Sequence, residues 1–281
     1  MKLKANAYAK LNLYLGVLNK RDDGYHNIDS VMQTISLHNT IEISVNDTNE
    51  VSITYQDPSL WREDDILFKT CEEFFKFSGW KKGLSISINH RIPTVAGLGG
   101  FSANIACLLH LLNRISGKNY SDDKMLPLCL KLGADVPFCY VGGTARVQNI
   151  GDKIDELPTV NFNLVLIKEG EKKSTGTMYN ILDQLSLSAS KKIDSIILGL
   201  YEGDARKVVS STYNAFENCY NMEEMKKLFN PFSPDAVFLS GSGPTVVSAF
   251  ISRERAENCY NTLKKEGRNV FLAECVGKTI E

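Results

Sequence analysis

Apolar and polar positions alternate along the first half of the chain with the period of a half-buried β-strand. The alternation is clear at residues 5–18, 40–55 and 84–88. A polar break at residues 46–49 divides the second of these stretches, and such a break between alternating runs is typical of a β-hairpin. Apolar residues at helical spacing predict helices at residues 64–78, 105–112 and 125–132.

The second half of the chain carries its own strands and helices, and we expect a change of domain near Pro158. The chain then divides into a first domain at residues 1–157 and a second at 158–281. The same patterns predict strands at residues 162–167, 236–240, 246–250 and 269–276. They predict helices at residues 179–187, 191–200, 205–211, 222–229 and 253–266, a further helix that begins at 213–217, and a polar loop at 168–177.

Three glycines, Gly97, Gly99 and Gly100, lie between a predicted strand and the helix that follows it. Glycine lets backbone N–H groups turn toward one point, and the first N–H groups of a helix lack partners within it. Phosphate is the expected ligand of such a site. The loop is neither a Walker loop nor a dinucleotide fingerprint, because it lacks the Lys-Ser/Thr pair of one and the last glycine of the other. An ordinary loop capped by Ser102 or Asn104 is the alternative.

Two charged side chains hold positions that suggest chemistry. Lys10 and Asn12 share one face of the first predicted strand, opposite Leu11 and Leu13, and so face a cleft if the leucines face the core. A solvated strand lysine is the alternative. Asp135 lies in an otherwise apolar segment, where a carboxylate must be paired, hydrogen-bonded or functional. A turn-capping aspartate is the plainer explanation of that position.

The composition limits the class of protein. A chain of 281 residues with 43% hydrophobic residues is long enough for two globular domains. Its 32 basic and 33 acidic residues nearly cancel, and no apolar run approaches the ~18 residues of a membrane span, so neither nucleic acid nor a membrane is an expected partner. Seven scattered cysteines without a C-x-x-C pair argue against zinc, and an N-terminus without an apolar signal core predicts a cytoplasmic protein.

Five segments of the chain together resemble one family of enzymes. Pro-x-x-x-Gly-Leu-Gly-Gly at residues 93–100 is the phosphate loop of the galactokinase, homoserine kinase, mevalonate kinase and phosphomevalonate kinase (GHMP) superfamily. The other segments are Ala-Lys-Leu-Asn-Leu at 9–13, Asp-Gly-Tyr-His at 23–26, Gly-Ala-Asp-Val-Pro-Phe at 133–138 and Ser-Gly-Ser-Gly-Pro-Thr at 240–245. In chain order, the first four of these segments together resemble the 4-diphosphocytidyl-2-C-methyl-D-erythritol kinase family. The Asp-Gly-Tyr-His and Gly-Ala-Asp-Val-Pro-Phe segments are the most specific of them.

The resemblance implies a two-domain α/β (α+β) fold with mixed sheets and a cleft between the domains. It implies ATP-dependent phosphorylation of the 2-hydroxyl of 4-diphosphocytidyl-2-C-methyl-D-erythritol, a step in non-mevalonate isoprenoid precursor synthesis. ATP and Mg²⁺ are the implied cofactors. A small cytidine-diphosphate compound is the implied substrate, and we expect a monomer or a homodimer.

The resemblance also assigns roles to single residues. Asp135 would take the proton from the substrate hydroxyl, and Lys10 beside it would hold that carboxylate ionised. Tyr25 and Tyr179 would stack on the cytosine ring while His26 binds its edge. The implied substrate residues are Asn12, Tyr25, His26, Thr175 and Tyr179. The implied ATP residues are Pro93, Val95, Ala96, Gly97, Leu98, Gly99, Gly100, Phe101, Ser102, Ala103, Gly241, Ser242 and Gly243.

The phosphate loop departs from the family pattern Gly-Leu-Gly-Gly-Gly-Ser-Ser-Asp-Ala-Ala, with Phe101, Ala103, Asn104 and Ile105 in place of glycine, serine, aspartate and alanine. A positive φ at Phe101 would strain the backbone by about 1–3 kcal/mol, whereas a negative φ would bring its ring near the nucleotide. Ser102 remains as the candidate metal ligand. Two other functions therefore stay open: a kinase-like protein that binds nucleotide or cytidine with weakened catalysis, and a GHMP kinase for another small alcohol.

Overall fold

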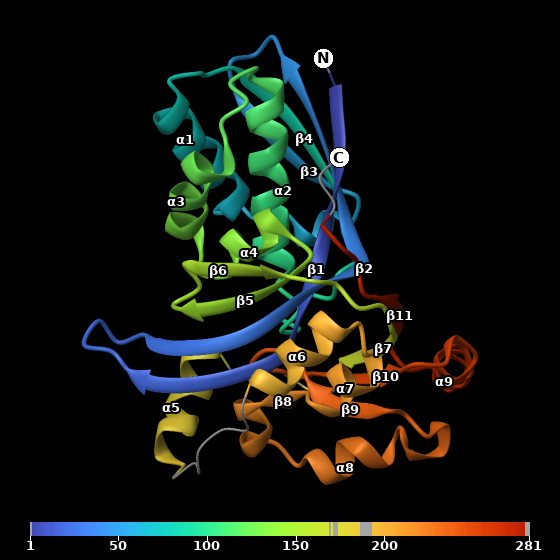
Figure 1. Cartoon of the computed structure of the whole chain (residues 1–281). Coiled ribbons are helices and arrows are strands. Elements are labelled where there is room, and N and C mark those ends of the chain that lie inside the picture. The colour runs from blue at the N-terminus through green and yellow to red at the C-terminus, as the bar shows by residue number, and fades with distance from the viewer. Residues whose placement is uncertain (1, 169, 171–173, 186–192, 279–281) are drawn as a thin grey trace.

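A computed structural model describes residues 2–168, 170, 174–185 and 193–278, which form two sheets and the helices packed on them (Figure 1). The polar loop expected at 168–177 and the helices expected at 179–187 and 191–200 each include residues outside the described ranges. No helix in the described ranges is long and apolar enough to cross a membrane.

The first sheet has seven strands among the described residues, in the order β3–β4–β2–β1–β8, with β5 paired to β2 and β6 to β5. The strands are β1 (Lys2–Lys20), β2 (His26–Asn46), β3 (Val51–Tyr55), β4 (Gly83–Asn89), β5 (Thr144–Asn149), β6 (Lys153–Leu157) and β8 (Tyr213–Asn214). β1 and β2 form a long antiparallel hairpin that curves through the molecule and reaches α5 with its turn (Figure 1). This hairpin carries Lys10 in its middle and His26 beside its turn.

β1 is buried on both of its faces around Lys10. Leu11 and Leu13 lie in the core, as the alternation predicts, yet Lys10 and Asn12 on the opposite face are only 4% and 1% exposed. The glycine loop covers that second face, and the backbone N–H of Lys10 donates to the carbonyl of Leu98 at 3.0 Å. Lys10 is therefore not a solvated strand lysine.

The prediction of a β-hairpin around residues 46–49 is wrong. β2 and β3 do not pair, because β4 lies between them, antiparallel to β2 and parallel to β3. The chain leaves β3, forms α1 (Ile66–Ser78) and returns as β4 in the middle of the sheet. Alternation of apolar residues predicts where strands lie, but it does not say which strands become neighbours.

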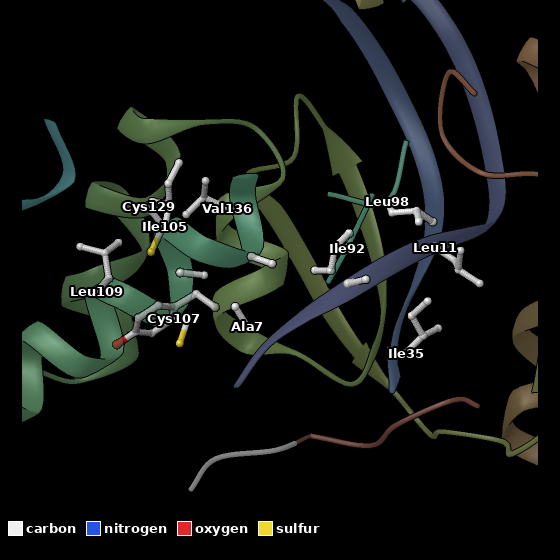
Figure 2. Close-up of a cluster of buried hydrophobic side chains, with 14 of the residues drawn as sticks. Ala7, Leu11, Ile35, Ile92, Leu98, Ile105, Cys107, Leu109, Cys129 and Val136 are labelled. Atoms are coloured by element: carbon white, nitrogen blue, oxygen red, sulfur yellow. The ribbon is translucent and has the colours of Figure 1, made fainter. Parts of the chain in front are cut away.

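Helices pack against the first sheet and enclose the larger part of the core (Figure 1). They are α1, α2 (Gly100–Ile115), α3 (Asp122–Leu132) and α4 (Val136–Val141). Figure 2 shows Ile105 and Leu109 of α2 and Val136 of α4 in one apolar cluster with Ala7 and Leu11 of β1. Burial of each large aliphatic side chain contributes about 1.5–3 kcal/mol, which fixes the start of α2 against β1.

The second sheet has the order β11–β7–β10–β9. Its strands are β7 (Asn163–Lys168), β9 (Ala236–Leu239), β10 (Thr245–Phe250) and β11 (Val270–Glu274). The helices of this half are α5 (Thr175–Gln184), α6 (Asp194–Glu202), α7 (Ala205–Ser210), α8 (Met222–Lys227) and α9 (Arg253–Lys265). Most of the first sheet lies in the upper part of Figure 1, and the second sheet lies in the lower part, where β8 of the first sheet is also drawn. The chain between β6 and β7 links the two.

The helix expected to begin at 213–217 begins at Ala215, as a short 3-10 helix that spans Ala215–Cys219. Its first two predicted residues form β8 instead, which pairs in parallel with Tyr14 and Leu15 of β1. The buried Asn214 side chain donates to the carbonyls of Leu239 and Gly241, which keeps this segment extended. The second half of the chain thus contributes a strand to the first sheet. The domain division at residues 157 and 158, between β6 and β7, stays a prediction.

Candidate active site

A cleft of about 720 Å³ lies between the first sheet, the glycine loop and the second half of the chain. It is lined by segments that are far apart in the sequence. These are β1, the turn after it, the glycine loop before α2, the start of α4, α5 and a second glycine turn at residues 240–245. The predicted residues that line it are Lys10, Asn12, Tyr25, His26, Pro93, Val95, Ala96, Gly97, Leu98, Gly99, Gly100, Phe101, Ser102, Asp135, Thr175, Tyr179, Gly241 and Ser242. Ala103 and Gly243 are the predicted residues that do not line the cleft.

Lys10 and Asp135 form an ion pair at the floor of this cleft. The Lys10 Nζ lies 3.1 Å from Asp135 Oδ2, and the two side chains are 5% and 35% exposed. Asp135 holds the N-cap position of α4, yet its side chain makes no capping hydrogen bond there. The turn-capping explanation therefore does not hold, and the carboxylate is presented to Lys10 and to the cleft.

The position of the Lys10 ammonium is fixed by a chain of buried hydrogen bonds. Lys10 Nζ donates to Asn12 Oδ1 at 2.9 Å, and Asn12 Nδ2 donates to Ser30 Oγ at 2.9 Å. The Ser30 hydroxyl in turn donates to the carbonyl of Tyr14 at 2.6 Å. Because each donor has a defined acceptor, the Asn12 amide has one orientation and its oxygen faces Lys10.

The glycine loop leaves backbone donors at the start of α2. Gly99 is the N-cap residue with a φ of 67°, and no side chain caps this end of the helix. The first N–H groups of a helix, here those of Gly100, Phe101 and Ser102, have no acceptor within it and carry its positive end. The N–H of Ala103 differs, because it donates to the carbonyl of Gly99 at 2.8 Å. We therefore leave Ala103 out of the set of free donors.

The ring of Phe101 does not strain the loop. Phe101 lies in the first turn of α2 and is not among the residues with positive φ. Its side chain is 56% exposed and lines the cleft. The strained position is Val95 instead, a β-branched residue with a φ of 52°, a conformation that costs about 1–3 kcal/mol.

The second glycine turn, at residues 240–245, packs directly against the first. Ser240 Oγ donates to the carbonyl of Gly97 at 3.0 Å. A Cβ atom on Gly97 would lie 2.4 Å from the carbonyl oxygen of Ser240, so only glycine allows this approach. Gly243 does not line the cleft, and its N–H donates to the carbonyl of Ser240 within the turn. Gly241 and Ser242 are the residues of this turn that line the cleft.

Aromatic rings gather where the turn of the β1–β2 hairpin meets α5. The rings of His26 and Tyr179 stack, with centroids 4.7 Å apart and an interplanar angle of 18°. Tyr179 also meets Phe216 edge to face at 5.0 Å. Tyr25 is 60% exposed and borders the same end of the cleft. Burial raises the pKa of Tyr179 to about 12, so its hydroxyl keeps its proton at neutral pH.

Asp183 and Lys20 make contacts in this region that the sequence did not predict. Asp183 Oδ1 lies 2.6 Å from Nε2 of His26, and its Oδ2 accepts a hydrogen bond from Lys20 at 2.8 Å. Hydrogen bonds from Lys20 and His26 hold the pKa of Asp183 below its usual range. Asp183 follows Tyr179 by four residues in a predicted helix, and this spacing is the signal that places both on one face.

Asn104 follows the glycine loop on α2 and does not line the first cleft. It is 2% exposed, and its Oδ1 accepts a hydrogen bond from Asn39 Nδ2 at 2.8 Å. The oxygen of Asn39 accepts from the backbone N–H groups of Arg91 and Ile92. The amide at position 104 therefore helps to anchor the start of the loop to β2.

A second cavity of about 580 Å³ opens on the far side of the loop. It shares Val95, Phe101 and Ser102 with the first cleft, and it is also lined by residues of α1 and α3. His90 borders both cavities, and its two ring nitrogens are buried without a partner among the described residues. Burial lowers the pKa of His90, so the ring is neutral at pH 7 and has one donor and one acceptor nitrogen.

Comparison with known proteins first defines the class. The GHMP kinases N terminal domain family matches residues 65–143, and the GHMP kinases C terminal family matches residues 200–269. Among solved structures, a 4-(cytidine 5'-diphospho)-2C-methyl-D-erythritol kinase superposes with a TM-score of 0.81 at 22% identity, covering 98% of this chain and 100% of the other. A mevalonate kinase from L. major superposes with a TM-score of 0.77 at 13% identity, covering 99% and 97%. The fold is that of the GHMP kinases, which confirms the predicted fold class.

Sequence relatives define the family within this class. A 4-diphosphocytidyl-2-C-methyl-D-erythritol kinase of Clostridium acetobutylicum is 34% identical over 98% of this chain and 100% of its own length. Kinases of the same name from Clostridium beijerinckii and Thermoanaerobacter pseudethanolicus are 32% and 31% identical, each over at least 98% of both chains. The chain belongs to the 4-diphosphocytidyl-2-C-methyl-D-erythritol kinase family, as the five sequence segments predict.

Proposed function

We propose that this protein is a kinase that transfers the γ-phosphoryl group of ATP to the 2-hydroxyl of 4-diphosphocytidyl-2-C-methyl-D-erythritol, a step in non-mevalonate isoprenoid precursor synthesis. The observation that carries the proposal is the Lys10–Asp135 pair, which shares one cleft with the glycine loop. The names of the full-length relatives support this choice of acceptor. We further propose that the protein works in the cytoplasm, whose reducing conditions suit a chain whose seven cysteines are odd in number and scattered along the sequence.

The proposed reaction uses the ion pair as the means of activating an alcohol. An alcohol is a weak nucleophile at neutral pH, and Asp135 would accept its proton as the oxygen attacks the γ-phosphorus. The bond from this phosphorus to the bridging oxygen breaks, and ADP leaves with the electron pair. The Lys10 ammonium, held by Asn12, stabilises the negative charge that develops on the attacking oxygen.

We place the phosphates of ATP at the start of α2. The N–H groups of Gly100, Phe101 and Ser102 provide donors there, and Gly241 and Ser242 border the same part of the cleft. The nucleoside then occupies the second cavity, which opens beyond the shared wall of Val95 and Phe101. This placement leaves the γ-phosphate on the side of the loop that faces Lys10 and Asp135.

The donor set fits Mg²⁺ that is carried by the nucleotide. Mg²⁺ usually keeps several water ligands and binds through substrate phosphates with only one or two protein oxygens. Ser102 supplies a hydroxyl beside the proposed phosphate site. The described residues contain no group of three His, Cys, Asp or Glu side chains that would hold a metal by themselves. Bound Mg²⁺ would neutralise charge on the phosphate oxygens.

The cytosine of the substrate would bind at the end of the cleft that is lined by Tyr25, His26 and Tyr179. We propose that Tyr25 and Tyr179 contact the two faces of the base and that His26 binds its edge. Tyr179 stacks on His26 in this structure, so the base would contact the part of the Tyr179 ring that His26 leaves free. Thr175, in the first turn of α5, borders the path from the base to the phosphate loop.

A turnover assay on the purified protein tests the proposal. We expect ADP release with Mg²⁺, ATP and 4-diphosphocytidyl-2-C-methyl-D-erythritol, and a ³¹P NMR signal for a new phosphomonoester on the acceptor. Homoserine and mevalonate serve as comparison acceptors and should give no turnover. Transfer to either would show a kinase for another alcohol. Binding of the cytidine compound by calorimetry without any transfer would show a kinase-like binding protein.

A further inference from the structure

Asp183, a residue to which the family resemblance assigns no role, orients the ring of His26. His26 is 8% exposed, and its Nε2 lies 2.6 Å from Asp183 Oδ1 on α5. The stacked ring of Tyr179, four residues before Asp183 on the same helix, holds the plane of the imidazole. Helix α5 thus fixes both the plane of the His26 ring and the direction of one of its nitrogens.

Asp183 must receive a proton from His26 and cannot give one. Its second oxygen accepts a hydrogen bond from the Lys20 ammonium at 2.8 Å, and a carboxylate beside a lysine stays ionised. The lowered pKa of Asp183 agrees with that charge. An ionised carboxylate is only an acceptor, so the proton in this contact belongs to Nε2 of His26. Lys20 and His26 thus bind the two oxygens of one carboxylate.

We propose that Asp183 is a positioning residue that fixes His26 in the tautomer with its proton on Nε2, and that this sets the base preference of the substrate site. Nδ1 is then an unprotonated acceptor on a residue that lines the cleft. The proposal rests on the proposed function, because it takes a cytidine diphosphate compound as the ligand.

An acceptor at this position distinguishes two pyrimidines. Cytosine presents an exocyclic amino group, which donates to Nδ1, whereas uracil presents an oxygen at the same place. An acceptor facing that oxygen leaves both groups without a partner and in mutual repulsion. Sites that hydrogen-bond a polar group of the ligand reject analogues in which the group is changed. Asp183 therefore favours the amino-substituted base, although it does not touch the base itself.

The test compares Asp183→Asn with Asp183→Glu. Asparagine has the size of aspartate, but its amide both donates and accepts, so it tolerates either tautomer of His26. Glutamate keeps an acceptor-only carboxylate. The readout is the ratio of the dissociation constants for CDP and UDP, measured by calorimetry, which needs no catalysis. We expect Asp183→Asn to lower the preference for CDP by about tenfold, the scale of one hydrogen bond, and Asp183→Glu to keep most of it.

The tautomer itself is observed by ¹⁵N NMR on protein labelled at its four histidines, with His26→Gln assigning the signal. We expect a protonated Nε2 and a bare Nδ1 in the unaltered protein, and a mixture of tautomers in Asp183→Asn. A protonated Nδ1 in the unaltered protein would overturn the inference. So would an Asp183→Asn variant that is folded by its thermal transition and keeps the full preference for CDP. Absence of turnover alone would count against the proposed function and leave these two measurements to decide the inference.

Discussion

At the scale of single residues, the surroundings of a side chain decide between its ordinary and its chemical role. Lysines on strands are mostly exposed, and the sequence of β1 left that possibility open for Lys10. Burial of the strand on both faces excludes it, because a buried ammonium needs partners, and Asn12 and Asp135 provide them. Asp183 was not predicted, since its contact with His26 exists only after α5 folds onto the hairpin.

Replacement of Lys10 by methionine separates its charge from its volume. The methionine side chain keeps the apolar stem that packs beside Gly99, so the fold should hold. We expect Lys10→Met to lower kcat by about 10²–10⁴, the usual contribution of a group that assists proton transfer, with the KM for the cytidine substrate within a few-fold. Steady-state kinetics with both substrates measures the two effects.

The matched control is Lys2→Met, which removes a lysine from the same strand at a position that is 65% exposed. Its kinetics should match those of the unaltered protein. A Lys10→Met variant with normal kcat and a raised KM would show that Lys10 only binds the substrate.

At the scale of elements, the site depends on how closely two glycine turns approach each other. The loop before α2 and the turn before β10 meet where the Ser240 hydroxyl binds the carbonyl of Gly97. Local pattern predicted both turns as glycine-rich loops. It did not predict their contact, because they lie in different halves of the chain and only the fold brings them together.

Because of this contact, position 97 tolerates a residue with a Cβ atom less well than a position that requires only a positive φ. Gly97 has a φ of 76°, and an added Cβ would meet a carbonyl oxygen at 2.4 Å. Gly267 has a φ of 78° with nothing within 4 Å of the same position. We expect Gly267→Ala to cost about 1–2 kcal/mol of unfolding free energy from backbone strain alone, and Gly97→Ala to cost more and to raise the KM for ATP.

Urea unfolding of both variants and the KM for ATP check this comparison. Equal losses of stability, with an unchanged KM for ATP in Gly97→Ala, would mean that the two turns do not meet as described.

The Glu73 carboxylate of α1 forms an ion pair with Lys131 of α3, and we expect its contribution to stability to depend on pH. Hydrogen bonds from Lys131 and Lys76 lower the pKa of Glu73 below the ordinary 4.5. A lowered pKa in the folded state adds stability that is complete above about pH 4.5 and is lost as pH falls through the folded-state pKa. We expect Glu73→Gln to be less stable than the unaltered protein at pH 7 and the difference to shrink below pH 4.5.

Chemical denaturation across this pH range measures the effect. Glu72→Gln, which removes an exposed carboxylate from the same helix, is the control and should have nearly the stability of the unaltered protein at pH 7. A difference for Glu73→Gln that is the same at acidic and neutral pH would contradict the assignment.

At the scale of the whole molecule, the chain folds so that distant segments form one cleft. The family resemblance of the five motifs predicted most of the lining residues, whereas the local pattern of each motif predicted only a strand, a glycine turn or a helix start. The order of strands was not predictable from pattern, since β4 enters between β3 and β2, and β8 returns to β1 from the second half. The second cavity and His90 also escaped prediction, because they depend on how α1 and α3 pack beside the loop.

The central claim is that Asp135 acts on the acceptor hydroxyl during phosphoryl transfer, and single-turnover kinetics of Asp135→Asn tests it most directly. Rapid-quench measurement with excess enzyme reports the chemical step, and calorimetry reports the affinity for 4-diphosphocytidyl-2-C-methyl-D-erythritol. We predict a chemical step slower by about 10²–10⁴, with the affinity within a few-fold of the unaltered protein. A variant that transfers phosphate at nearly the normal rate would contradict the account.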